Sequence, residues 1–347
     1  MTVQHAARRP VNRDEVILEV RDLAVSFDSP DGKVHAVNGV SFRLRAGESL
    51  GVVGESGSGK SVTMMSLVGL LPSPPASVDS GTAILRDEGT EIDLLAASRQ
   101  EIRQVRGGKM GFVFQDPLSA LNPTMRIGEQ IAESVRKHRG LDDATAKAET
   151  IALLSAVGIA DPARRYRSYP HEFSGGMRQR VMIAIAMAAD PPIVIFDEPT
   201  TALDVTVQAQ IVELVKTRLQ EERGTAVIWI THDLAVVAGI ADRVAVMYGG
   251  TVVESGPVDE IYERPLHPYT RGLLEAIPST DSDGSTRLAS IEGSPPDLLV
   301  EPNFCPFQPR CAYAFDRCLV ERPILRDVSE RHRVACHYDL EGSEQLR

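Results

Sequence analysis

Eight consecutive residues of this chain read Gly54-Glu55-Ser56-Gly57-Ser58-Gly59-Lys60-Ser61 and fit the pattern G-x-x-x-x-G-K-[ST]. A short apolar run at 50–53 precedes them, and a helical pattern at 62–71 follows. Glycines let the backbone curl with its N–H groups pointing inward, so such a loop and the helix after it form an anion site. The stretch predicts an ATP-binding loop in which Lys60 contacts the β- and γ-phosphates and Ser61 contributes its hydroxyl to Mg²⁺.

A pair of acidic residues, Asp197 and Glu198, ends a second apolar run at 193–196. A run this apolar is typical of a strand that is covered on both faces. We expect Asp197 to hold Mg²⁺ and Glu198 to polarise the water that attacks the γ-phosphate. Together with Lys60, the pair predicts a catalytic site that converts ATP and water to ADP and phosphate.

The order of strand and helix patterns indicates an α/β fold with a doubly wound parallel sheet. Apolar runs at 50–53, 193–196 and 225–231 are separated by helical patterns, which is typical of such a sheet. Residues 16–44 alternate apolar and polar around a turn and predict an antiparallel β subdomain. We divide the chain into a disordered tail (1–14), a nucleotide-binding domain (15–258) with a helical subdomain (about 99–189), and a small, irregular, Pro- and Cys-rich C-terminal extension (259–347).

The composition argues against several classes of protein. The 347 residues carry 37 Lys and Arg against 48 Asp and Glu, a net charge of −11. Phosphate backbones attract basic proteins, so no nucleic-acid partner is expected. The longest apolar stretch is interrupted by Asp190, Pro191 and Pro192, so we expect no part of the sequence to span a bilayer by itself. The first fifteen residues lack the apolar centre of a secretory signal.

A third motif indicates a family. Residues 173–180 read FSGGMRQR and resemble the LSGGQ signature of ATP-binding cassette (ABC) ATPases, which Ser174, Gly175 and Gly176 match one by one. Phe173 and Met177 depart from its commonest form. The resemblance implies the P-loop NTPase fold and a head-to-tail dimer, in which the three matching residues contact the ATP held by the partner subunit.

Four further positions match other motifs of the ABC family. The resemblance places Gln115 at the ATP-site glutamine whose loop contacts both Mg²⁺ and the membrane partner, and Asp204 in the loop of the dimer contact. It places His232 at the switch histidine that contacts the γ-phosphate, which makes it catalytic beside Lys60 and Glu198. Phe27 matches the aromatic residue that stacks on adenine.

Three longer stretches narrow the resemblance to the oligopeptide/dipeptide/nickel importers. They are FQDPLSALNP at 114–123, RPLHPYTRGLL at 264–274 and IEGSPP at 291–296. The resemblance implies a peripheral ATPase subunit at the cytoplasmic face of the inner membrane that powers import of di- and oligopeptides. Its implied partners are two membrane permeases, a second nucleotide-binding subunit that is a paralogue, and an extracytoplasmic solute-binding protein. A nickel or other small-solute importer is the alternative, and a non-transport ABC ATPase that acts on nucleic acid is a remote one.

All four cysteines, Cys305, Cys311, Cys318 and Cys336, fall in the last 43 residues, with the spacing C-x5-C-x6-C-x17-C. Disulfides do not persist in reducing cytoplasm, and zinc sites favour more closely spaced pairs. Wider spacing suits an iron–sulfur cluster, and the tail of the importer subfamily resembles such a ligand set. We expect the four thiolates to hold a structural [4Fe–4S] cluster, with zinc and unmetallated thiols as the alternatives.

Overall fold

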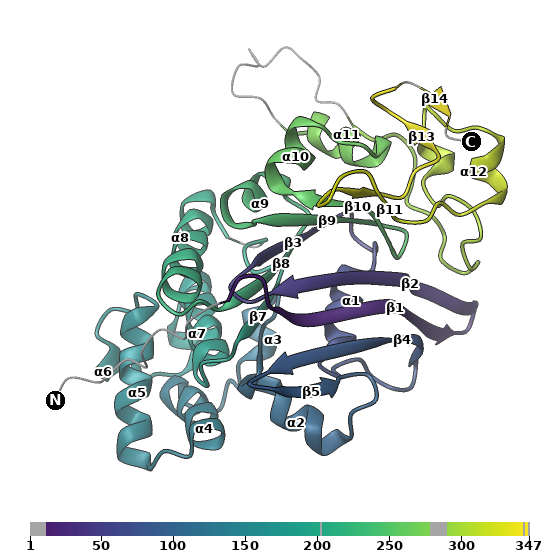
Figure 1. The fold of residues 1–347 in the computed structure, drawn as a ribbon. Helices are drawn as coiled ribbons and strands as arrows, with labels where there is room; N and C mark the ends of the chain where they lie inside the picture. The colour runs from purple at the N-terminus through teal and green to yellow at the C-terminus, as the bar shows by residue number, and fades with distance from the viewer. Residues whose placement is uncertain (1–11, 202, 278–289, 343, 346–347) are drawn as a thin grey trace.

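The chain is organised around two large sheets (Figure 1). A computed structural model describes residues 12–201, 203–277, 290–342 and 344–345, so the predicted tail at 1–14 lies largely outside the described residues. The first sheet is antiparallel in the order β2-β1-β4-β5, formed by β1 (Val16–Ser29), β2 (Gly32–Arg45), β4 (Ala76–Asp87) and β5 (Thr90–Asp93). Because β1 and β2 pair from Val16 to the turn at Ser29 and Gly32, the predicted antiparallel subdomain is confirmed.

The second sheet has eight strands in the order β11-β12-β10-β9-β3-β8-β7-β6. Its parallel part contains β3 (Ser49–Val53), β6 (Met110–Val113), β7 (Ile193–Asp197), β8 (Ala226–Thr231) and β9 (Arg243–Tyr248). β10 (Thr251–Pro257) turns back on β9 in antiparallel orientation, through Gly249 and Gly250, whose φ angles are 54° and 77°. The sheet is therefore mixed, whereas the sequence predicted a parallel one. The difference arises because two consecutive glycines allow a tight hairpin between β9 and β10.

Helices cover this second sheet and form a separate group beside it (Figure 1). The predicted helical subdomain contains α2 (Arg99–Gly108), α3 (Pro117–Ala120), α4 (Ile127–Arg139), α5 (Asp143–Ala156), α6 (Pro162–Arg165), the short 3₁₀ turn η1 (Pro170–Glu172) and α7 (Gly175–Met187). Around the parallel strands lie α1 (Lys60–Leu67), α8 (Val205–Val215), the π-helical η2 (Lys216–Glu221) and α9 (Leu234–Ile240). None of the helices in the described part of the chain is long and apolar enough to cross a bilayer.

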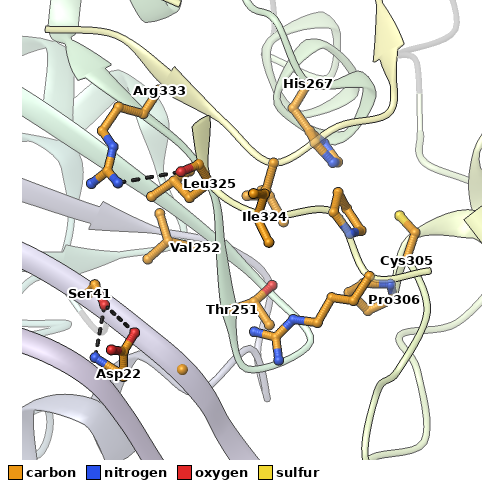
Figure 2. A pocket seen from close by; sticks show the side chains of 15 residues that line it. Asp22, Ser41, Thr251, Val252, His267, Cys305, Pro306, Ile324, Leu325 and Arg333 are labelled. Carbon is orange, nitrogen blue, oxygen red and sulfur yellow. Dashed lines mark hydrogen bonds between the residues drawn. The ribbon is translucent and has the colours of Figure 1, made fainter. Parts of the chain in front are cut away.

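The described part of the C-terminal extension packs on the same sheet. It contains α10 (Val258–Glu263), α11 (Pro268–Glu275), the 3₁₀ turn η3 (Gln308–Arg310), α12 (Asp316–Val320) and four two-residue strands, β11 (Arg326–Asp327), β12 (Arg333–Val334), β13 (Tyr338–Asp339) and β14 (Glu344–Gln345). β12 pairs with β10, so the extension continues the core sheet. A cavity of about 450 Å³ lies at this junction, and Figure 2 shows Cys305 and Pro306 on one side of it and Asp22 and Ser41 on another.

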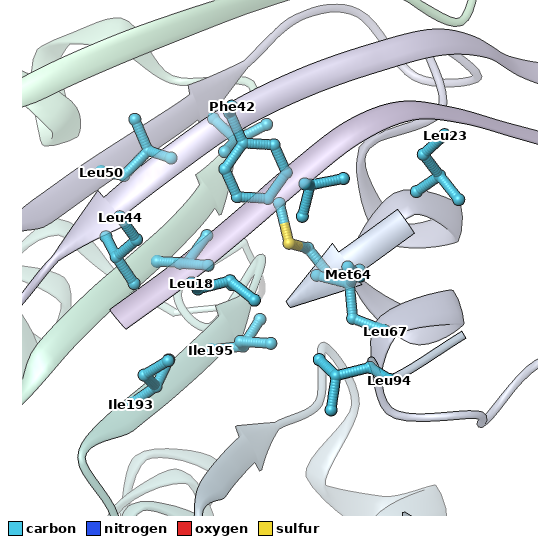
Figure 3. Close-up of a cluster of buried hydrophobic side chains, with 14 of the residues drawn as sticks. Leu18, Leu23, Phe42, Leu44, Leu50, Met64, Leu67, Leu94, Ile193 and Ile195 are labelled. Carbon is cyan, nitrogen blue, oxygen red and sulfur yellow. The ribbon is translucent and has the colours of Figure 1, made fainter. Parts of the chain in front are cut away.

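Buried apolar side chains hold the two sheets together. Figure 3 shows one cluster in which Leu18 and Phe42 of the antiparallel sheet face Met64 of α1 and Ile195 of β7. Leu18 and Met64 are no more than 1% exposed. Full burial of such a side chain contributes about 1.5–3 kcal/mol. The cluster therefore fixes α1, and the loop before it, against β7.

Candidate active site

The predicted phosphate-binding loop (residues 54–61, called the phosphate-binding loop below) joins β3 to α1, as the sequence predicts. Gly54 has φ of +154°, and a Cβ there would lie 2.1 Å from the carbonyl oxygen of Met247, so only glycine fits this close approach to β9. Lys60 is buried, and its Nζ donates to the carbonyl oxygens of Gly54 at 2.7 Å and Glu55 at 2.8 Å. Burial lowers the pKa of Lys60, and the neighbouring carboxylates oppose this effect. The amino group of Lys60 thus lies inside the loop that the motif predicts to bind phosphate.

Ser61 and Asp197 form the oxygen pair that the sequence predicts for Mg²⁺. Ser61 Oγ donates to Asp197 Oδ1 at 2.6 Å, across the space between α1 and the end of β7. Burial raises the pKa of Asp197, and the hydrogen bond from Ser61 partly offsets this rise. Mg²⁺ prefers hard oxygen ligands and usually takes one or two from the protein while phosphates and waters supply the rest. The two oxygens fit such an ion.

Three polar side chains converge on one oxygen of Glu198. Its Oε2 accepts hydrogen bonds from Gln115 Nε2 at 3.2 Å and from Thr201 Oγ1 at 3.0 Å, and it lies 3.4 Å from His232 Nδ1. The structure therefore brings the predicted Gln115, Glu198 and His232 together. Thr201 is a contact that sequence reasoning did not assign to the site.

The backbone of Glu198 fixes where its carboxylate lies. Its φ is +45°, in the left-handed region that non-glycine residues seldom adopt, and its N–H donates to the carbonyl of Ile230 on β8 at 3.0 Å. Such strain persists only where the surroundings hold it, and it is common at functional sites. The Glu198 side chain is 15% exposed, which leaves its carboxylate accessible to a water molecule.

Comparisons with known proteins identify the family. The chain is 50% identical to the oligopeptide transport ATP-binding protein OppD of Bacillus subtilis over 92% of its own length and 87% of that protein's. The chain belongs to the ABC transporter family. The family described as ABC transporter matches residues 37–201, and the one described as oligopeptide/dipeptide transporter, C-terminal region, matches 253–318.

Two further comparisons extend this result. The dipeptide transport ATP-binding protein DppD of Bacillus subtilis is 48% identical over 93% of this chain and 94% of its own. Among solved structures, the post-hydrolysis dimer of an ATP-binding cassette bound to ADP and Pi matches with a TM-score of 0.61 and 27% identity. It covers 70% of this chain and 98% of that one. This chain is thus an ABC ATPase with the α/β P-loop fold.

The predicted signature residues lie at the start of α7, in the predicted helical subdomain. Ser174 caps the N-terminus of α7, and its Oγ accepts from Met177 N at 3.4 Å. A Cβ added at Gly176 would lie 2.9 Å from Val207 on α8, so the signature packs closely against the helix that Asp204 caps. The N–H groups at the start of α7 suit an anion, as the resemblance implies.

Phe27 lies on β1, opposite Val34 on β2 and Ala76 on β4. Its ring packs, half-buried, against the cluster in Figure 3. Stacking of this ring on adenine stays a prediction.

The predicted iron–sulfur site is wrong for this ABC ATPase. Across residues 12–201, 203–277, 290–342 and 344–345, no group of three or more His, Cys, Asp or Glu side chains is placed to hold a metal ion, so zinc has no such ligand set either. The four cysteines are free thiols. Burial raises the pKa of Cys305 to about 12 and that of Cys336 to about 11, which favours the neutral thiol over the thiolate that binds metals.

Proposed function

We propose that this ABC ATPase powers the import of peptides through a membrane transporter. The observation that supports this most strongly is the similarity to oligopeptide and dipeptide transport ATP-binding proteins over nearly the whole chain, including the C-terminal region. In this proposal residues 15–258 bind and hydrolyse ATP, and the extension at 259–347 is the importer-type addition.

In the proposed mechanism a water molecule attacks the γ-phosphorus in line, the bond from that phosphorus to the β–γ bridging oxygen breaks, and ADP leaves. Glu198 orients that water and acts as the general base that accepts its proton. Gln115 and His232 hold the Glu198 carboxylate in place. Lys60 stabilises the charge on the transferred phosphoryl group. Ser61, Asp197 and Gln115 would hold Mg²⁺, which when bound neutralises charge on the β- and γ-phosphates.

A second nucleotide-binding subunit is part of the proposal. Val205, directly after Asp204, is 82% exposed, although it is apolar and lies beside the signature helix. The solved ATP-binding cassette that is similar to this chain is a dimer, which supports a contact between two such subunits. We infer that Ser174, Gly175 and Gly176 complete the ATP site of a partner, which we expect to be a paralogue, with Asp204 at the contact.

Exposed apolar residues also flank Gln115. Phe114 and, on α3, Leu118 are 37% and 64% exposed. We infer that this surface docks on two membrane permeases, which would hold the ATPase peripherally at the cytoplasmic face of the inner membrane. A solute-binding protein outside that membrane would deliver the peptide.

The test of this function is ATP hydrolysis in vesicles that contain the permeases and both ATPase subunits. We expect a peptide-loaded binding protein to raise turnover several-fold over the unloaded protein. Stimulation by a nickel-loaded binding protein but by no peptide would favour the small-solute alternative. Stimulation by DNA or ribosomes without permeases would overturn the proposal.

Replacing Ser174 with alanine tests the partner contact. We expect turnover to fall by about 10- to 100-fold with unchanged ATP binding to the mutated subunit, because a hydrogen bond to a charged group contributes about 1.5–3 kcal/mol. Steady-state turnover and ATP titration would measure the two effects. The matched control is Asp142→Ala, which removes the cap of α5, where Asp142 accepts from Thr145 N at 2.8 Å. Equal losses in both variants would indicate helix destabilisation and contradict the assignment.

A further inference from the structure

The C-terminal extension holds the second residue of the phosphate-binding loop. Arg310 Nη1 donates to Glu55 Oε2 at 2.7 Å, and Arg310 Nη2 donates to Glu55 Oε1 at 3.0 Å. This is a two-bond fork between residues 255 positions apart. Bidentate arginine–carboxylate pairs fix geometry as well as contributing energy. The arginine side chain is 4% exposed and the glutamate side chain 26%.

Arg310 is itself held in one orientation. Its Nε donates to the carbonyl of Glu292 at 2.9 Å, and its Nη2 donates to the carbonyl of Ile291 at 3.0 Å. Its Nη1 also donates to the hydroxyl of Tyr248 at 3.2 Å, and its guanidinium lies 5.7 Å from the centre of that ring. Since all three nitrogen atoms are engaged, the guanidinium presents a rigid surface to Glu55.

A second group from the extension contacts the same loop residue. The N–H of Glu55 donates to the hydroxyl of Tyr269, on α11, at 2.8 Å. Tyr269 is fully buried, and its ring packs 4.6 Å from that of Tyr248 and 5.4 Å from that of Phe307, centre to centre. The extension thus anchors both the main chain and the side chain of Glu55 on an aromatic base.

Lys60 holds the same segment from inside the loop, through the carbonyls of Gly54 and Glu55. The direction of the loop N–H groups toward phosphate therefore depends on contacts from both sides. We propose that the C-terminal extension is a clamp on the phosphate-binding loop, in which Arg310 and Tyr269 act as positioning residues that set ATP affinity through Glu55. The clamp couples the extension to the nucleotide, and such coupling acts in both directions.

The inference rests on the proposed ATP site and is tested on the full chain with ATP and Mg²⁺. For Arg310→Gln we expect the Kd and KM for ATP to rise about tenfold, within the range typical of coupled sites, with kcat within about twofold of the wild type. In the double variant with Arg310→Gln and Glu55→Gln, the second substitution should add little to the rise in Kd and KM. Each substitution alone already breaks the ion pair between Arg310 and Glu55. The matched control is Arg317→Gln, which removes an exposed ion pair with Glu321 in the same extension and should leave all three constants unchanged.

Hydrogen exchange supplies a second readout, and its measurement on the wild type does not depend on whether a variant folds. ATP should slow exchange of the backbone amides at 305–311 and 268–275 in the wild type, and this protection should be lost in Arg310→Gln. Unchanged exchange in the wild type, or unchanged KM in a folded Arg310→Gln, would overturn the clamp. Failure of the wild type to bind ATP, or unimpaired binding by Lys60→Ala, would instead contradict the ATP site itself.

Discussion

Replacing Glu198 with glutamine is expected to lower kcat for ATP hydrolysis by about 10²–10⁴-fold while ATP still binds. The amide has nearly the shape of the carboxylate, and its oxygen can still accept from Gln115 and Thr201, which both contact Glu198 Oε2. It cannot take a proton from the attacking water. The loss therefore falls on the chemical step.

Phosphate release at saturating ATP, beside an ATP-binding titration, would measure both effects. Glu222→Gln is the control, because Glu222 is an exposed residue whose carboxylate pairs with the side chain of Arg218, four residues earlier. The control should keep full turnover. Normal turnover in Glu198→Gln would rule out Glu198 as the residue that activates water.

Replacing His332 with leucine is expected to lower the free energy of unfolding by about 3 kcal/mol, because it leaves a buried charge without its partner. Glu254 on β10 is fully buried, and its Oε1 lies 2.8 Å from His332 Nε2. The Glu254 carboxylate also accepts hydrogen bonds from the N–H groups of Leu266 and His267, at 2.7 and 2.9 Å. Two backbone hydrogen bonds do not neutralise a carboxylate.

Chemical denaturation of the full chain at constant pH would measure this loss. Adding Glu254→Gln to His332→Leu removes the unpaired charge and should recover much of the stability, since the amide oxygen still accepts from the backbone. His171→Leu, at an exposed position, is the control and should change stability by less than about 0.5 kcal/mol. A stability loss in the double variant as large as in the single one would show that packing, and not charge, accounts for the effect.

The same pair makes stability depend on pH. Burial lowers the pKa of His332, but hydrogen bonds and charge from Glu254, together with Glu260 3.2 Å from Nδ1, outweigh it and raise the pKa overall. The stabilisation is therefore complete below the unfolded pKa of about 6.5 and is lost as pH rises through the higher folded pKa. Denaturation between mildly acidic and alkaline pH should show this loss in the wild type and not in His332→Leu. If the free energy of unfolding changed with pH in the same way in both proteins, the result would contradict a role for His332 in this dependence.

The convergence of the predicted site residues follows from a simple rule of parallel sheets. Gly54, Gln115, Glu198 and His232 come just after β3, β6, β7 and β8. The carboxyl ends of parallel strands lie at one edge, so residues that follow them in the chain meet in space. The pattern of apolar runs therefore indicated both the sheet and the place of the site. Thr201 was not assigned to the site, because a single threonine in a loop carries no periodic signal.

The C-terminal extension was less predictable, because its structure depends on contacts with distant residues. The fork between Arg310 and Glu55 joins an irregular segment to a loop 255 positions away, and nothing local in the sequence signals it. The cysteine spacing led to the wrong prediction of an iron–sulfur site for a related reason. In a segment with few regular elements, the number of residues between Cys318 and Cys336 does not determine where their sulfur atoms point.

Pairing of the extension with the core also changes what the sheet presents to other chains. Glu254 and Ser255 of β10 pair with Val334 and Arg333, and the outermost strand becomes β11, the two charged residues Arg326 and Asp327. Long, uncovered edge strands are templates for pairing between molecules, whereas short and charged ones resist it. The extension therefore covers the middle of β10 and leaves a strand of two charged residues at that edge of the sheet, which by this rule is a poor template for pairing with another molecule.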